Sequence, residues 1–319
     1  MYDIVIIGGG PAGITASIYG VRAGKKVLVL EAKKVGGKIL MAHMVDNYPG
    51  MPHVTGEELG KSFLDQALDL GVEIKYEKAM GIIDEGDKKI VQTLDNMYET
   101  KTIILATGGD KRELGLPNEK ELLGKGVSYC ATCDGNFFKN KDVAIVGGGM
   151  ESLTDVFYLA NLCHKVYYIY SKKIEVKKFD NVEVIDNSKI VEIRGTEKLE
   201  SIVLDKDNRE LKVDGLFIEI ASVPETGYLL NDLDVDKDGN VLAVYGMSTN
   251  KPGIFIAGDI RVKILKQVAT AISDGATAAA QAIKYINEKN WSNFSFFMQH
   301  CFLLLIYIFL IPYLFWYSV

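Results

Sequence analysis

The chain has 319 residues, 48% of them hydrophobic and 24% charged, which is long enough for two domains with full hydrophobic cores. Its net charge of −6, without a basic block or a base-stacking motif, argues against general nucleic-acid binding. Four cysteines, only two of them suggestively spaced, do not make a disulfide scaffold and fit a reducing cytoplasm. The first residues enter a buried strand pattern without a signal peptide, so we expect a cytoplasmic protein.

The N-terminal pattern predicts a strand, a glycine turn, a helix and a second strand. These elements are expected at residues 3–8, 12–23 and 26–31. Gly8, Gly10 and Gly13 occupy the turn, and Glu31 closes the second strand. The glycines let the backbone approach a pyrophosphate at the helix N-terminus, and Glu31 can accept hydrogen bonds from an adenosine ribose. The unit therefore predicts a dinucleotide site.

A later apolar segment, residues 102–109, predicts a strand that leads out of the first domain. It ends in the small residues Ala106, Thr107 and Gly108, where a cofactor could pass.

Cys130 and Cys133 form a C-x-x-C pair, followed at once by Asp134 and Gly135. This spacing can close and open a small disulfide ring, which suits exchange of electron pairs with the disulfide of another protein. Zinc also uses this spacing, but a zinc site needs four ligands, and here there is one pair with scattered histidines. We expect no metal. A chance pair of core cysteines is the plain alternative.

A second strand–turn–helix–strand unit begins at Lys141. Its parts are expected at residues 142–146, 147–149, 152–162 and 165–170. The sequence after about residue 246 returns to the first domain, with a strand over 253–259 and a helix of small residues over 269–280.

We therefore predict an α/β fold with two doubly wound, Rossmann-like, three-layer domains, the second inserted into the first through two linkers. The first domain takes residues 1–112 and 246–291, and the second takes 113–245. Residues 292–319 form an apolar tail that approaches the length of a membrane-spanning helix. This tail is either a membrane anchor or a segment foreign to the fold.

Residues 1–291 resemble the low-molecular-weight thioredoxin reductases. The glycine turn, the Cys130–Gly135 block and the Gly258-Asp259 block with Gln267 carry the resemblance. It implies bound FAD, a homodimer, thioredoxin as the protein substrate, and a redox disulfide presented to the flavin. It further implies that Cys133 lies nearest the flavin ring and that Asp134 is the acid/base of the thiols, although Asp134 could instead be a plain turn residue. Which cysteine attacks the substrate stays open.

The turn and the resemblance together assign FAD binding to a set of residues in the first domain. They are Gly8, Gly10, Pro11, Ala12, Gly13, Glu31, Gly36, Gly37, Lys38, Ile39, Asn47, Ala106, Thr107, Gly108, Gly258, Asp259, Gln267, Val268 and Ala269.

The second unit departs from the NADPH-using members of this family. Ser152 stands where they carry a small glycine-type residue, Glu151 precedes it, and residues 170–175 contain no arginine to grip a 2′-phosphate. These departures resemble the ferredoxin-dependent flavin thioredoxin reductases, whose donor is ferredoxin. Arg261, Lys263 and Lys266 are then expected to form a basic landing surface for ferredoxin, to which Lys172 and Lys173 contribute.

Three functions remain in competition. The first is a ferredoxin-linked reductase of thioredoxin, and the second is an NADPH-dependent thioredoxin reductase with a degenerate pocket. The third belongs to another class: a membrane-tethered flavoprotein whose disulfide senses redox state without turnover.

Overall fold

The computed structural model describes residues 1–109, 113–148, 150–172, 179–220, 232–237 and 239–291, without the side chains of residues 150 and 151. The predicted apolar tail, residues 292–319, lies outside these described residues. Within them, no helix combines the length and the apolar character that a membrane crossing requires.

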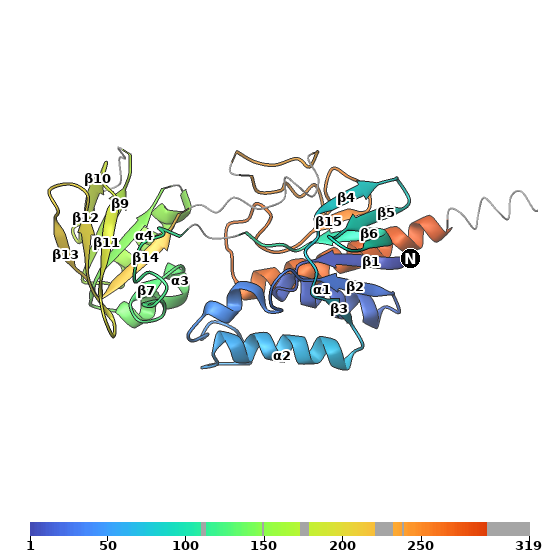
Figure 1. Ribbon diagram of the computed structural model, residues 1–319, viewed down its shortest axis with the longest axis horizontal. Helices are drawn as coiled ribbons and strands as arrows, with labels where there is room; N and C mark the ends of the chain where they lie inside the picture. Colours follow the sequence, from blue (N-terminus) through green and yellow to red (C-terminus); the bar gives the residue numbers. More distant parts are fainter. Residues whose placement is uncertain (110–112, 149, 173–178, 221–231, 238, 292–319) are drawn as a thin grey trace, which may run out of the picture.

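The first unit is built on a sheet in which the described strands follow the order β3-β2-β1-β6-β5-β4, with β15 also paired to β6 (Figure 1). Its strands are β1 (Tyr2–Ile7), β2 (Val27–Leu30), β3 (Glu73–Lys75), β4 (Gly81–Asp84), β5 (Lys89–Gln92), β6 (Met97–Leu105) and β15 (Ile254–Ile256). Strands β3, β2, β1, β6 and β15 run parallel, so their carboxyl ends meet at one edge. Strands β4, β5 and the first half of β6 form an antiparallel meander.

Helices cover one face of this sheet. Alternate residues of β1, such as Ile4 and Ile6, pack with α1 (Pro11–Arg22) and with the C-terminal helix, residues 268–291. The intervening residues Val5 and Ile7 face the other core, which includes Leu233 and Val241. Helix α2 (Gly56–Asp69) lies beside α1 and begins with a capping box between Thr55 and Glu58.

The second unit has a parallel sheet of order β10-β9-β8-β14-β7 among the described strands. These are β7 (Val127–Ser128), β8 (Asp142–Gly147), β9 (Lys165–Tyr170), β10 (Val182–Asp186) and β14 (Gly215–Glu219). One face packs against α3 (Ala131–Asp134) and α4 (Met150–Ala160). The other packs against an antiparallel sheet of β11 (Ile190–Gly195), β12 (Leu199–Leu204) and β13 (Glu210–Lys212).

The predicted fold of two Rossmann-like α/β units is confirmed. The antiparallel sheet β11-β12-β13, which replaces helices on one face, was not predicted. The domain limits stay a prediction, but Leu233 and Val241 already belong to the core of the first unit. We therefore propose that the first unit resumes before Leu233 rather than at residue 246.

Close packing joins the C-terminal helix to the start of α1. A Cβ atom added to Gly275 would lie 2.1 Å from the carbonyl oxygen of Ala12, far inside contact distance. The backbones therefore approach each other as closely as only glycine allows at this position.

We predict that Gly275→Ala lowers the thermal unfolding midpoint, although alanine is favoured over glycine in a helix by about 1 kcal/mol. Forcing the two helices apart should cost about 1–3 kcal/mol in the free energy of unfolding. Glu288→Ala, at an exposed position of the same helix, is the matched control. A higher midpoint for Gly275→Ala than for wild type would contradict the close packing.

Candidate active site

Four predicted site residues meet at the carboxyl edge of the first sheet. Gly8 follows β1, Glu31 follows β2, Thr107 follows β6, and Asp259 follows β15. The parallel pairing of these four strands brings their ends together. A crevice at the carboxyl ends of parallel strands is where α/β proteins bind ligands.

The three glycines of the turn have different reasons to be glycine. Gly8 has φ +108, and a Cβ there would lie 2.4 Å from the carbonyl oxygen of Ala106. A Cβ on Gly13 would lie 1.9 Å from the carbonyl oxygen of Gly8. A Cβ on Gly10 would meet nothing within 4 Å. Gly8 and Gly13 are therefore needed for packing, and Gly10 alone leaves space for a ligand.

Glu31 is buried beside the turn. Its Oε2 accepts a 2.6 Å hydrogen bond from Gly9 N, and its Oε1 accepts a 2.7 Å bond from Lys33 N. A carboxylate has about four acceptor positions, so both oxygens can still accept from a ribose hydroxyl. The next loop packs on the same turn, because Gly36 N donates to Gly9 O and a Cβ on Gly37 would lie 3.3 Å from Gly10 Cα.

Among the described residues, the buried oxygens Thr107 Oγ1 and Asp259 Oδ1 have no hydrogen-bond partner. Lys263 Nζ lies 3.1 Å from Asp259 Oδ1, but the pair does not have hydrogen-bond geometry. Buried polar atoms of this kind are normally satisfied, so both oxygens are suited to the polar groups of a bound cofactor.

The redox pair lies in the second unit, around the short helix α3. Cys130 and Cys133 form a disulfide with a Cα–Cα distance of 5.3 Å. Ser128 Oγ accepts a 3.0 Å hydrogen bond from Cys130 N and donates a 2.6 Å bond to Asp134 Oδ2. The predicted acid/base carboxyl is therefore held next to the disulfide by a hydroxyl.

A second carboxyl group, that of Glu119, holds the residue that precedes the disulfide. Glu119 is buried, accepts from the backbone N–H groups of Leu114 and Gly115, and accepts a 2.7 Å hydrogen bond from Tyr129 OH. Burial, and then the carboxyl of Glu119, raises the pKa of Tyr129 above its ordinary value. The Tyr129 hydroxyl therefore remains a donor and anchors the residue that precedes Cys130.

Comparisons with known proteins show the family to which a chain with this site belongs. The model of the pyridine nucleotide-disulphide oxidoreductase family matches residues 2–275. The thioredoxin reductase of Peptoclostridium acidaminophilum is 40% identical over 306 residues, which cover 90% of this chain and 97% of that protein. The chain belongs to the thioredoxin reductases of this family. It is a flavoprotein disulfide oxidoreductase that uses FAD, so the predicted family and cofactor are confirmed.

Solved structures of such reductases resemble this chain to different degrees. That of Streptococcus pyogenes has a TM-score of 0.85 at 35% identity, over 90% of this chain and 99% of its own. That of Lactococcus lactis, in the FR conformation, has 0.64 at 36%, over 90% and 100%. A ferredoxin-flavin thioredoxin reductase from Clostridium acetobutylicum has 0.54 at 36%, over 91% and 99%. The sequence identities of the three are therefore similar, whereas the TM-score is lower for the last two.

The residues at the sheet edge fit FAD. The open side of Gly10, the remaining acceptor positions of Glu31 and the unsatisfied oxygens of Thr107 and Asp259 all lie at this edge. Further predicted contact residues surround it: Gly258 has φ +85, and a Cβ on it would lie 3.0 Å from Ala12 Cβ. All the FAD contacts assigned from the sequence stay predictions, including those at Pro11, Gly36, Gly37, Lys38, Ile39, Asn47, Ala106, Gly108, Gln267, Val268 and Ala269.

The structure brings Gln267 of the first unit to the disulfide of the second. Its Nε2 donates a 2.9 Å hydrogen bond to Thr132 Oγ1 and lies 3.7 Å from each sulfur. Its Oε1 accepts a 3.1 Å bond from Asn47 Nδ2. Sequence reasoning assigned Gln267 and Asn47 to the cofactor and did not find this contact with the redox pair.

The glycine turn of the second unit differs from that of the first at two equivalent positions. In the strand registers, Glu31 follows the pair Ile7–Leu30, and Tyr170 follows the pair Val146–Ile169, so Tyr170 takes the place of Glu31. A Cβ on Gly148 would lie 2.2 Å from Tyr170 Cε2, because the ring covers this glycine. Ser152, the counterpart of Gly13, is buried, and its hydroxyl lies 3.3 Å from Tyr168 OH.

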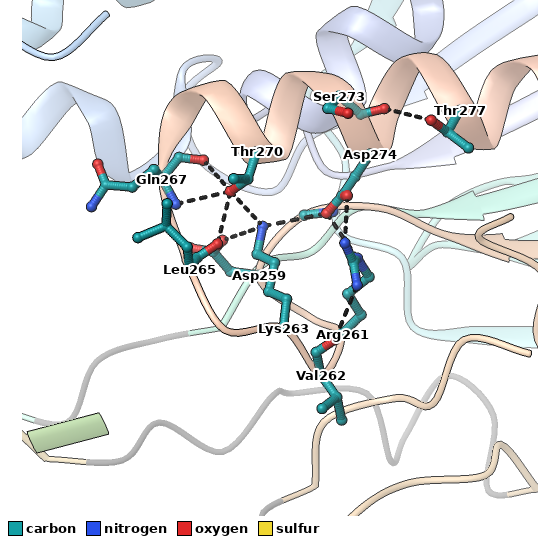
Figure 2. A network of polar contacts seen from close by, with 11 residues as sticks. Asp259, Arg261, Val262, Lys263, Leu265, Gln267, Thr270, Ser273, Asp274 and Thr277 are labelled. Carbon is teal, nitrogen blue, oxygen red and sulfur yellow. Dashed lines mark hydrogen bonds and ion pairs between the residues drawn. The ribbon is translucent and has the colours of Figure 1, made fainter. Parts of the chain in front are cut away.

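The structure corrects the expected ferredoxin surface (Figure 2). Arg261 donates to both carboxylate oxygens of Asp274, at 2.9 and 2.8 Å. The Lys263 side chain is only 4% exposed and lies between Asp274 and Asp259. Arg261 and Lys263 are therefore internal ion-pair partners, and Lys266 also has a partner. The landing surface predicted from these residues is wrong because nearby carboxylates neutralise Arg261 and Lys263. Lys172 is exposed, whereas Lys173 and the Glu151 side chain lie outside the described residues.

We predict that Gly10→Ala weakens FAD binding while leaving the apoprotein folded. Its backbone angles, φ −73 and ψ −177, suit alanine, but the new methyl group would fill the space left for the ligand. An overpacking cost of about 1–3 kcal/mol corresponds to roughly 5- to 150-fold weaker binding. Gly13→Ala should instead lower both stability and binding. Fluorescence titration with FAD and circular dichroism of the apoprotein separate the two, and unchanged affinity for Gly10→Ala would count against this site.

We predict that only the redox pair among Cys130, Cys133 and Cys163 reacts readily after reduction. Burial, and then the charge of Asp142, raises the pKa of the Cys163 thiol to about 11, so only about 0.1% is thiolate at pH 8. Alkylation by iodoacetamide, followed by peptide mass spectrometry, should label Cys163 at least about 100-fold more slowly and faster as the pH rises. The unfolded protein is the control, and equal labelling rates in the folded protein would refute the assignment.

Proposed function

We propose that this reductase takes electrons from reduced ferredoxin and passes them through FAD and the Cys130–Cys133 disulfide to thioredoxin. The proposal includes a homodimer in the cytoplasm, as the family resemblance implies, and the FAD contacts assigned above.

The observation that carries the choice of donor is the Tyr170 ring against Gly148. In the first unit the equivalent Gly9 faces Glu31, whose carboxylate receives a backbone N–H and can receive a ribose. In the second unit an aromatic ring takes that place and offers no carboxylate. NADH would lose the acceptor for its ribose hydroxyl, and both NADH and NADPH would have to displace the ring from the turn.

Three other features favour the same donor. Ser152 puts a buried side chain at the helix position where the first unit needs glycine. Residues 170–175 contain no arginine, the side chain suited to bidentate recognition of a 2′-phosphate. In addition, the similar protein of Clostridium acetobutylicum is named a ferredoxin-flavin thioredoxin reductase.

The residues around the disulfide fit its reduction. FAD supplies the ability to accept electrons singly and to deliver them as a pair. Two electrons break the Cys130–Cys133 bond, and two protons convert both sulfurs to thiols. Asp134, oriented by the Ser128 hydroxyl, is placed to move one of these protons. The thiols then return the electron pair to the disulfide of thioredoxin, which becomes a dithiol.

A second candidate donor is NADPH. The strand–turn–helix of β8 and α4 is retained with Gly147 and Gly148, and Lys172 is exposed near the end of β9. These retained elements favour a weakened nucleotide site over a site that has been lost completely. A redox sensor without turnover is the third reading, and catalytic reduction of thioredoxin distinguishes it from both reductases.

We predict that reduced ferredoxin bleaches the flavin under anaerobic conditions and supports thioredoxin reduction, whereas micromolar NADPH does neither. Missing charge-assisted bonds to a 2′-phosphate typically cost about 2–5 kcal/mol, which is roughly 30- to several thousand-fold in affinity. Flavin absorbance and thioredoxin thiol release are measured with each donor. Cys133→Ser is the control, since its flavin should still be reduced without thioredoxin turnover. Rapid turnover with NADPH would transfer the protein to the NADPH-dependent class.

A further inference from the structure

The Gln267 side chain forms a hydrogen-bonded bridge between the two units. On one side its carbonyl accepts from Asn47, in the loop after η1 (Gly37–Met41). On the other side its amide donates to Thr132, the residue between the two cysteines. Thr132 Oγ1 lies 3.5 Å from Cys130 Sγ, and a disulfide sulfur can only accept, so the donors in this chain all point towards the redox pair.

Gln267 is held from behind by the polar cluster of Figure 2. Thr270 Oγ1 accepts from Gln267 N at 3.1 Å and from Lys263 Nζ at 3.3 Å. Lys263 in turn pairs with the buried Asp274. Lys263, which its ion pairs make unavailable for docking ferredoxin, therefore fixes the loop that carries Gln267.

Only one hydrogen bond of the bridge crosses between the units, from Gln267 Nε2 to Thr132 Oγ1, because Asn47 belongs to the same unit as Gln267. The crossing bond joins two neutral groups, so it belongs to the weaker class of hydrogen bonds and positions the disulfide without burying a charge.

We propose that Gln267 is a positioning residue that holds the disulfide helix α3 on the FAD-binding unit during electron transfer. The inference rests on the proposed reduction of thioredoxin but not on the identity of the electron donor. While the bridge is formed, two electrons and two protons convert the Cys130–Cys133 disulfide to two thiols. The thiols then pass the electron pair to the disulfide of the protein substrate.

The test compares variants that remove the same hydrogen bond from opposite units. Gln267→Ala removes the donor, Thr132→Val removes the acceptor with little change of shape, and the double variant removes both. Thr132→Ser keeps the hydroxyl and is the matched control. The FAD-loaded protein is reduced by light with a photosensitiser and a sacrificial amine as electron donor, and transfer to the disulfide is followed by flavin absorbance, so neither ferredoxin nor NADPH is needed.

We expect Gln267→Ala and Thr132→Val each to slow this internal transfer about 3- to 10-fold, and the double variant to be no slower than either. Thr132→Ser should match wild type. With thioredoxin as substrate, kcat should fall while KM is not raised, which a general loss of structure would not produce. Flavin content and melting temperature check that each variant is folded.

Unchanged internal transfer in folded Gln267→Ala, or additive losses in the double variant, would overturn the bridge. Transfer that slows as expected in protein that fails to reduce thioredoxin would support the bridge and count against the proposed function. The two failures are therefore distinguishable.

Discussion

The arrangement of the site depends on one buried carboxylate, Asp274. It accepts hydrogen bonds from Gly258 N, from two nitrogens of Arg261 and from Lys263 Nζ. A buried charge is tolerated only when it is fully paired, and this one is paired with groups from the turn that follows β15. The C-terminal helix is thereby attached to the edge of the sheet where Asp259 lies. The same helix begins at Val268, directly after Gln267, so the cofactor edge and the contact with the disulfide share one anchor.

The two glycine turns show how one local fold supports different chemistry. Both turns connect a parallel strand to a helix, and the strand registers match position by position. In the first, glycine at position 13 permits the tightest approach, and Glu31 leaves acceptor capacity at the edge. In the second, Ser152 and Tyr170 fill the equivalent positions with side chains. The second unit thus keeps the scaffold and uses a different part of it, the segment from Ser128 to Asp134, to carry the disulfide.

Much of the fold and of the candidate site could be predicted from the local sequence, because glycine spacing and strand periodicity act over a few residues. The turn at Gly8–Gly13, its acidic partner Glu31 and the pairing of Cys130 with Cys133 are of this kind. The role of Arg261 and Lys263 was mistaken, because Asp274 lies more than ten residues away and only the fold brings it close. The covering of Gly148 by Tyr170 could have been found by aligning the two units, in which Glu31 and Tyr170 correspond. No pattern in the sequence indicates that Ser128 orients Asp134.

The bridge between the units contains amides and a hydroxyl but no ion pair. Electrolyte weakens interactions between exposed charges and leaves hydrogen bonds between neutral groups almost untouched. Contact between the disulfide and the FAD-binding unit should therefore be insensitive to ionic strength, whereas encounters with charged protein partners should not be. The rate of internal electron transfer to the disulfide should then stay constant as the cellular salt concentration changes. Only the rates of association with charged protein partners should change.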